Sequence, residues 1–144
     1  MVIIAVAVLV ITLPFINKAF EWDDGEVIKF AEVFKDNPTQ LHLENFGYLG
    51  RFNEQFRTSH PPGVSYYLAF YMKLGFGVNE ALYHMAFIIF PLIAAISMYL
   101  LARRFTRHAL VAALLLVVTP GFIVTSHSLW SDMPGVAFWL LATA

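Results

Sequence analysis

The feature that most constrains this chain is the segment 81–102, 22 residues without Asp, Glu, Lys or Arg. At 1.5 Å of rise per residue, a helix of this length reaches about 33 Å, enough to cross a hydrocarbon core of ~30 Å. Arg103, Arg104 and Arg107 follow the apolar run directly. This pattern predicts a helix that crosses a membrane and ends at a basic turn.

The composition agrees with an integral membrane protein. Hydrophobic residues make up 59% of the chain and charged residues 13%, whereas soluble domains carry about 45–50% and about 25%. The formal net charge of −1 excludes the electrostatic footprint of a nucleic-acid binder. The absence of cysteine excludes thiolate catalysis, iron–sulfur ligation and thiolate zinc sites, but leaves metal binding by His and carboxylates open.

Three further apolar runs predict spans at about 2–16 and 109–125 and part of a span at about 135–144. The first could be a secretory signal or a span, and the lack of a basic segment before it favours the span. The last has about ten residues, too few to cross. We therefore expect an all-α integral membrane fold with polytopic helices, of which residues 1–144 are an N-terminal fragment of one membrane domain.

The segment 17–62 carries most of the acidic residues and reads as a loop outside the membrane. Within it, Val27, Phe30, Ala31 and Phe34 recur at the spacing of an amphipathic helix, which Asp36-Asn37-Pro38 ends. Such a helix beside a span is expected to lie on the bilayer surface. Residues 63–77 are apolar, rich in tyrosine and too short to cross, so we expect a second interfacial helix there.

The arginine-rich turn after residue 102 is typical of a cytoplasmic loop. The loop 17–62 and the turn 126–132 are then both extracytoplasmic, and they share one face even if the orientation is inverted. The five basic residues of the first loop count against this orientation, but they are spread along a longer segment that also carries acidic residues.

Candidate site residues gather on that shared face. Asp23, Asp24 and Asp132 are carboxylates at the edge of a bilayer, where such groups can serve as a general base or hold a cation. Each has a structural alternative, because Asp23 with Glu26 has the spacing of a capping box and Asp132 can cap the last helix. His60 precedes two prolines and could be an ordinary turn residue.

Other polar residues carry weaker signals. Arg57 suits a phosphate but is also typical of a solvated surface. His84 and His127 lie near helix ends and are expected to be interfacial side chains. Two histidines without a defined spacing do not predict a metal site.

The order of the motifs carries a family resemblance. Trp22-Asp23-Asp24-Gly25-Glu26 follows the first span, Ser59-His60-Pro61-Pro62-Gly63 precedes the aromatic segment, and Leu129-Trp130-Ser131-Asp132-Met133-Pro134 precedes the last run. In this order the chain resembles the N-terminal part of the GT-C membrane glycosyltransferases, in particular protein O-mannosyltransferases and the aminoarabinose transferase that modifies lipid A. The resemblance implies transfer of a sugar from a polyprenyl phosphate carrier to a protein or lipid acceptor on the extracytoplasmic side of the membrane.

The resemblance also implies roles for single residues. Asp23 would be the catalytic carboxylate with Asp24 beside it, although many members have Glu at the second position. His60, where some members have Lys, would bind the donor together with Arg57 and Tyr66. The acidic residue of the later turn corresponds to Asp132.

Other expectations follow from the same resemblance. It is compatible with a divalent metal, for which Asp23, Asp24 and Asp132 are the candidates, but does not require one. It favours a bacterial or archaeal plasma membrane over the endoplasmic reticulum, and it predicts that the fragment is inactive alone, because later helices complete the donor pocket.

Two other classes of function stay open. A transporter would be expected to carry acidic residues within its spans, and here the spans contain none. A small structural membrane protein that binds a partner through its polar loop is the other alternative.

Overall fold

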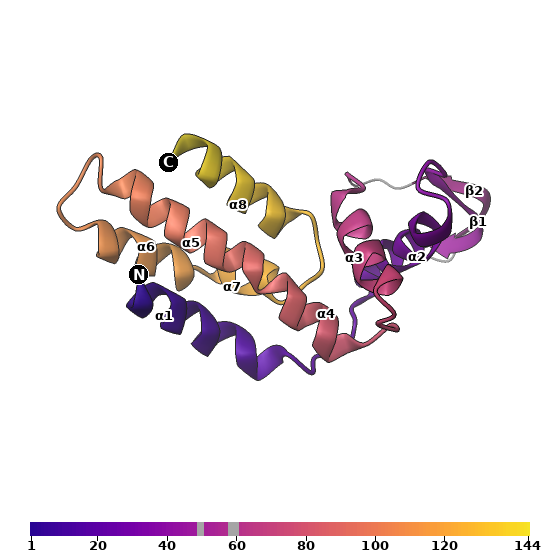
Figure 1. Ribbon diagram of the computed structural model, residues 1–144, viewed down its shortest axis with the longest axis horizontal. Coiled ribbons are helices and arrows are strands. Elements are labelled where there is room, and N and C mark those ends of the chain that lie inside the picture. Colours follow the sequence, from indigo (N-terminus) through magenta and orange to yellow (C-terminus); the bar gives the residue numbers. More distant parts are fainter. Residues whose placement is uncertain (49–50, 58–60) are drawn as a thin grey trace. The chain divides into compact units, whose positions relative to one another are not determined.

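A computed structural model describes residues 1–48, 51–57 and 61–144 (Figure 1). For Trp22 and for two strands between residues 42 and 57, only the backbone is described. The chain forms two compact units, Met1–Ala19 with Glu80–Ala144, and Phe20–Asn79.

The first unit is a helical bundle built around one central helix (Figure 1). Helix α5 contacts five other helices of this unit, namely α1, α4, α6, α7 and α8. Its inward positions carry the small residues Ala94, Ala95 and Ser97, all buried, which allow neighbouring backbones to approach closely. The elements are α1 (Val2–Thr12), the 3₁₀ turn η1 (Leu13–Phe15), α4 (Glu80–Phe87), α5 (Ile89–Ala102), α6 (Ala109–Val117), α7 (Pro120–Ser126) and α8 (Asp132–Thr143).

One helix of the described residues is long and apolar enough to cross a membrane by itself. It comprises α4 and α5, Glu80–Ala102, and has 23 residues. Helices α6 and α7 pass the same criterion only when they are counted together, and they meet at an angle of 61°. The bend lies within the span expected over 109–125, at Pro120, which lacks the N–H that would continue the helix.

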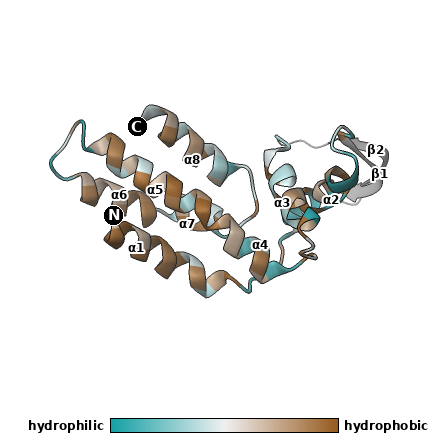
Figure 2. Ribbon diagram, viewed as in Figure 1, coloured by the Kyte–Doolittle hydropathy of each residue, from teal (hydrophilic) through white to brown (hydrophobic). Residues whose placement is uncertain are grey.

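The residues along α1, α5 and α6 are mostly hydrophobic (Figure 2). Large apolar side chains are exposed on several helices of this unit, including Val10, Leu115, Val124, Phe138 and Trp139. A helix that is hydrophobic all round is typical of an apolar environment.

The second unit pairs two helices through aromatic contacts. Helix α2 (Trp22–Asp36) packs against α3 (Gly63–Lys73). The ring of Phe34 stacks on that of Tyr66 with 4.3 Å between centroids, and the Tyr66 hydroxyl donates a hydrogen bond to the carbonyl of Pro38 at 2.5 Å. Phe30, Ala31 and Phe34 are buried, in agreement with the predicted apolar stripe.

A β-hairpin corrects the expectation of an all-helical chain. Strand β1 (His42–Tyr48) pairs antiparallel with β2 (Arg51–Arg57), in a register that runs from His42 opposite Arg57 to Tyr48 opposite Arg51. Both segments contain aromatic residues, which favour strands. Only two residues separate them, a spacing that is typical of hairpins.

Helix α3 ends in a Schellman motif. The N–H of Phe76 donates to the carbonyl of Tyr71, and the N–H of Gly75 donates to that of Met72. Gly75 has a φ of 88°, a left-handed conformation that glycine adopts without steric cost. The Tyr71 and Phe76 rings lie 6.4 Å apart and provide the apolar contact that accompanies this motif.

Candidate functional site

The acidic motif of the first loop forms the first turn of α2. The helix begins at Trp22 with Glu21 as its N-cap. The Asp24 carboxylate accepts a hydrogen bond from the Glu21 N–H at 2.9 Å, and the Glu21 side chain accepts one from the backbone N–H of Asp24. This reciprocal pair is a capping box, so the box expected between Asp23 and Glu26 is wrong by two positions.

The three acidic residues of this turn differ in exposure. Asp24 is fully buried and its carboxylate holds the start of the helix. Glu26 is also buried, whereas Asp23 is partly exposed. Asp23 is therefore the carboxylate of this motif with the greatest access to a ligand. Both Asp23 and Asp24 lie where a helix dipole stabilises negative charge.

Asp132 occupies the first turn of α8 and lines a pocket. Ser131 is the N-cap of this helix, so the alternative role of Asp132 as the cap is wrong. Asp132 is exposed, and the pocket measures about 500 Å³. Its remaining lining residues come from α6, α7, α8 and the segments between them: Leu116, Thr119, Gly121, Phe122, Thr125, Ser131, Met133, Gly135 and Val136.

The break between α6 and α7 shapes this pocket. Thr119 is the N-cap of α7, with Pro120 at its first position, and its hydroxyl oxygen accepts from the Phe122 N–H at 3.4 Å. The same hydroxyl donates to the carbonyl of Leu116 at 2.8 Å. Sequence reasoning missed the two threonines, Thr119 and Thr125, that line this pocket. The Thr-Pro pair was the available signal, because Ser or Thr before Pro is typical of a helix start.

The residues predicted to bind the donor are Arg57, His60 and Tyr66, which all fall in the range Phe20–Asn79 of the sequence. His60 lies outside the described residues. Arg57 ends strand β2, opposite His42 in the backbone register. Tyr66 lies on α3 and is partly exposed. Its ring stacks on that of Phe34, and its hydroxyl donates to the Pro38 carbonyl.

The aromatic surface of α3 includes a second tyrosine pair. The hydroxyls of Tyr67 and Tyr71 lie 3.2 Å apart. Burial raises the pKa of Tyr67 above its ordinary value, and the hydrogen bond with Tyr71 raises it further. Tyr67 therefore stays neutral throughout the physiological range.

His84 and His127 of the first unit are buried, which corrects the expectation of interfacial side chains. The Nε2 atom of His84 lies 3.1 Å from the carbonyl oxygen of Lys18. His127 makes the corresponding contact with the carbonyl of Ile11. His84 therefore holds the segment that follows η1, His127 holds the last turn of α1, and both are structural residues.

Metal ligation finds no support in the part of the chain that the structure describes. Across residues 1–41 and 61–144, whose side chains are described except for Trp22, no group of three His, Asp or Glu residues could hold a metal ion. Asp23 and Asp24 are neighbours in one unit, whereas Asp132 belongs to the other.

The sequence model of the dolichyl-phosphate-mannose-protein mannosyltransferase family matches residues 59–144. This range contains α3 and the first unit from α4 onward, including Asp132 and its pocket. No curated protein and no solved structure is significantly similar to the chain.

Proposed function

The chain belongs to the dolichyl-phosphate-mannose-protein mannosyltransferase family, and we propose that it transfers a sugar from a polyprenyl phosphate carrier to a protein or lipid acceptor on the extracytoplasmic face. The family consists of membrane glycosyltransferases of the mannosyltransferase type. The family match carries this proposal. It favours a glycosyltransferase over the transporter and the partner-binding protein that the sequence left open.

The proposed reaction breaks the bond between the anomeric carbon and the phosphate of the carrier. Its transition state has oxocarbenium character, as in glycoside hydrolysis. The acceptor hydroxyl or amine loses a proton to a base, while negative charge grows on the departing phosphate. The site therefore needs one accessible carboxylate and positive groups near the phosphate.

Asp23 suits the base better than its neighbour does. Its side chain is partly exposed, whereas that of Asp24 is fully buried and accepts the Glu21 N–H. We assign proton abstraction to Asp23. Asp24 is then a positioning residue that fixes the helix turn carrying the base.

Asp132 is proposed to orient the acceptor. It lines a pocket whose other lining residues are mainly apolar and include Thr119, Thr125 and Ser131. Hydroxyl and carboxylate groups that converge in an apolar pocket are typical of sites for polar small molecules.

The donor side of the site is proposed to use His60 and Arg57 for the phosphate and Tyr66 for the lipid-linked sugar. Guanidinium groups bind phosphate oxygens in a bidentate manner. The partly exposed ring of Tyr66 suits a position at the membrane interface. A divalent metal at Asp23, Asp24 or Asp132 is not required by this chemistry.

We further propose that the protein is multi-pass. The helix Glu80–Ala102 is long enough to cross, and the exposed apolar side chains on α1, α6 and α8 would lie against lipid. The broken pair α6 and α7 would line a pocket within the protein, the setting in which non-helical backbone is tolerated at membrane depth.

Replacing Asp23 tests the proposed base. In the full-length protein, we expect Asp23→Asn to lower the rate of sugar transfer from a synthetic polyprenyl-phosphate sugar by about 10²–10⁴-fold, with unchanged amounts in the membrane. Asp36→Asn is the matched control, because Asp36 is an exposed carboxylate at the other end of the same helix. Near-normal transfer by Asp23→Asn would remove Asp23 from the mechanism, and loss of activity in both variants would point to the helix instead.

A further inference from the structure

The turn between α5 and α6 concentrates positive charge in a stretch of sequence that has no acidic residues. Arg103, Arg104 and Arg107 lie within five residues, and His108 follows. Between Glu80 and Asp132 the sequence contains no Asp or Glu. Glu80 begins the 23-residue helix that the arginines follow, so about 33 Å of helix separates it from them.

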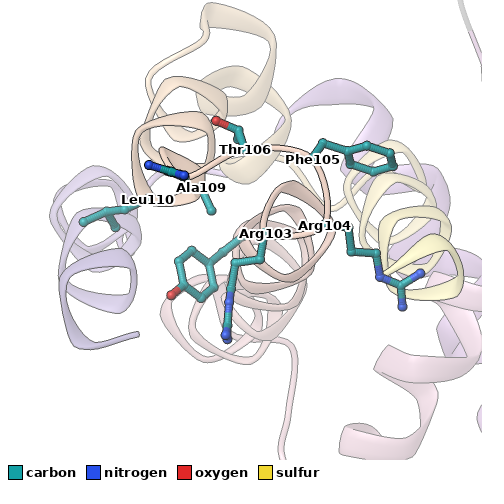
Figure 3. Close-up of a pocket in the computed structure, with 8 residues that line it drawn as sticks. Arg103, Arg104, Phe105, Thr106, Ala109 and Leu110 are labelled. Atoms are coloured by element: carbon teal, nitrogen blue, oxygen red, sulfur yellow. The ribbon is translucent and has the colours of Figure 1, made fainter.

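The arginines line a pocket of about 500 Å³ at this turn, together with Tyr99, Phe105, Thr106, Ala109 and Leu110. Figure 3 shows the Arg103 side chain extending along one side of the turn, while Arg104 points away from it. The Arg103 guanidinium lies 5.7 Å from the centroid of the Tyr99 ring, a cation–π geometry. Among the described residues, neither Arg104 nor Arg107 forms a salt bridge, and both side chains are exposed.

An aromatic side chain stands beside these charges. Phe105 is 82% exposed, the highest fraction among the large apolar residues of the described chain. A phenylalanine between arginines at the end of a membrane-length helix suits the boundary between headgroups and acyl chains. The guanidinium groups would then extend to the level of the lipid phosphates.

We propose that this turn, defined as residues 103–108, binds the phosphate of an anionic phospholipid headgroup. The positive charge of the arginine side chains at the level of the lipid phosphates recognises the ligand, and their N–H groups donate hydrogen bonds to phosphate oxygens. The lipid source is favoured over free phosphate by Phe105, since an exposed phenyl ring gains nothing from an inorganic anion but inserts among acyl chains. This proposal is independent of the transfer reaction, because it uses none of the residues proposed for the sugar site.

The test measures lipid binding to the full-length protein in detergent micelles. Native mass spectrometry would quantify bound dioleoyl-phosphatidylglycerol, with dioleoyl-phosphatidylcholine as the zwitterionic comparison and inorganic phosphate as the soluble one. We expect phosphatidylglycerol to bind preferentially. The double variant Arg104→Gln/Arg107→Gln should bind it about 25-fold more weakly, about five-fold for each arginine removed.

Two matched variants separate the site from net charge and from misfolding. Lys29→Gln/Lys35→Gln removes the same charge from exposed positions on α2 and should change binding less than two-fold. Arg104→Lys/Arg107→Lys keeps the charge and should retain most of the binding. Three results would each overturn the proposal. The first is equal weakening by Lys29→Gln/Lys35→Gln and by Arg104→Gln/Arg107→Gln, and the second is equal binding of phosphatidylcholine. The third is binding by Arg104→Lys/Arg107→Lys that is as weak as that of Arg104→Gln/Arg107→Gln. Displacement of the lipid by millimolar inorganic phosphate would overturn the lipid assignment.

Discussion

The Nε2 atom of His127 lies 2.7 Å from the carbonyl oxygen of Ile11, a residue 116 positions earlier in the chain. A carbonyl only accepts hydrogen bonds, so the imidazole proton resides on Nε2. The ring also lies 4.0 Å from that of Phe15. His127 therefore holds the end of the first helix to the turn that precedes Asp132.

Removing this ring is expected to loosen the first unit. His127→Ala deletes a buried donor and a ring contact, and should lower the free energy of unfolding by about 1–3 kcal/mol. The measurement is the thermal midpoint of the full-length protein in detergent. His108→Ala removes an exposed histidine and should leave the midpoint nearly unchanged. Equal midpoints for wild type and His127→Ala would show that the contact contributes nothing.

The capping box of α2 gives a second prediction, about stability. Asp24→Ala removes the acceptor of the Glu21 N–H and should cost about 0.5–2 kcal/mol. Asp23→Ala, one residue earlier, should cost less, because Asp23 is not part of the capping box formed by Glu21 and Asp24. Thermal midpoints of the two variants would be compared in parallel, and a larger loss for Asp23→Ala would contradict the assigned helix start.

The raised pKa of Tyr67 predicts that the stability of the folded protein falls at alkaline pH. Because burial and Tyr71 raise its pKa, the folded state retains the phenol proton at a pH where the unfolded chain loses it. This contribution to stability is complete below the unfolded pKa of about 10 and is lost as the pH rises through the folded value. Thermal midpoints between about pH 8 and 11 should therefore fall more steeply for wild type than for Tyr67→Phe. Parallel slopes would refute the prediction.

Gly75 provides a test of the end of α3. An alanine there meets no atom within 4 Å, so the cost of Gly75→Ala is conformational and should be about 1–2 kcal/mol at a φ of 88°. Gly77→Ala has the same free space without the positive φ. A stability loss as large in Gly77→Ala would assign the effect to the loop rather than to the left-handed backbone.

Local patterns predicted the helices that have strong periodicity. The stripe of Phe30, Ala31 and Phe34 identified the buried face of α2, because a single helix face decides which residues are buried. The charge-free run before Arg103 identified the long helix for the same local reason. The resemblance carried by the motif order identified the family.

Local patterns failed where a distant partner decided the outcome. Strands β1 and β2 have no strict alternation of apolar and polar residues, so their pairing with each other outweighs the local period. His84 and His127 are buried because backbone carbonyls of Lys18 and Ile11 lie beside them, and no spacing in the sequence reports that. The capping box of α2 lies two positions before the predicted one, because Glu21, a less common cap than Asp, forms the reciprocal pair with Asp24.

The hydroxyl of Thr119 carries a consequence for the pocket at Asp132. Pro120 has no N–H to offer Leu116, and the Thr119 hydroxyl donates to that carbonyl instead. The bend therefore leaves no unmet backbone acceptor at that position for water or a ligand to satisfy. We expect this bend to be rigid rather than to open and close, so that the pocket has its final shape before the substrate that accepts the sugar binds.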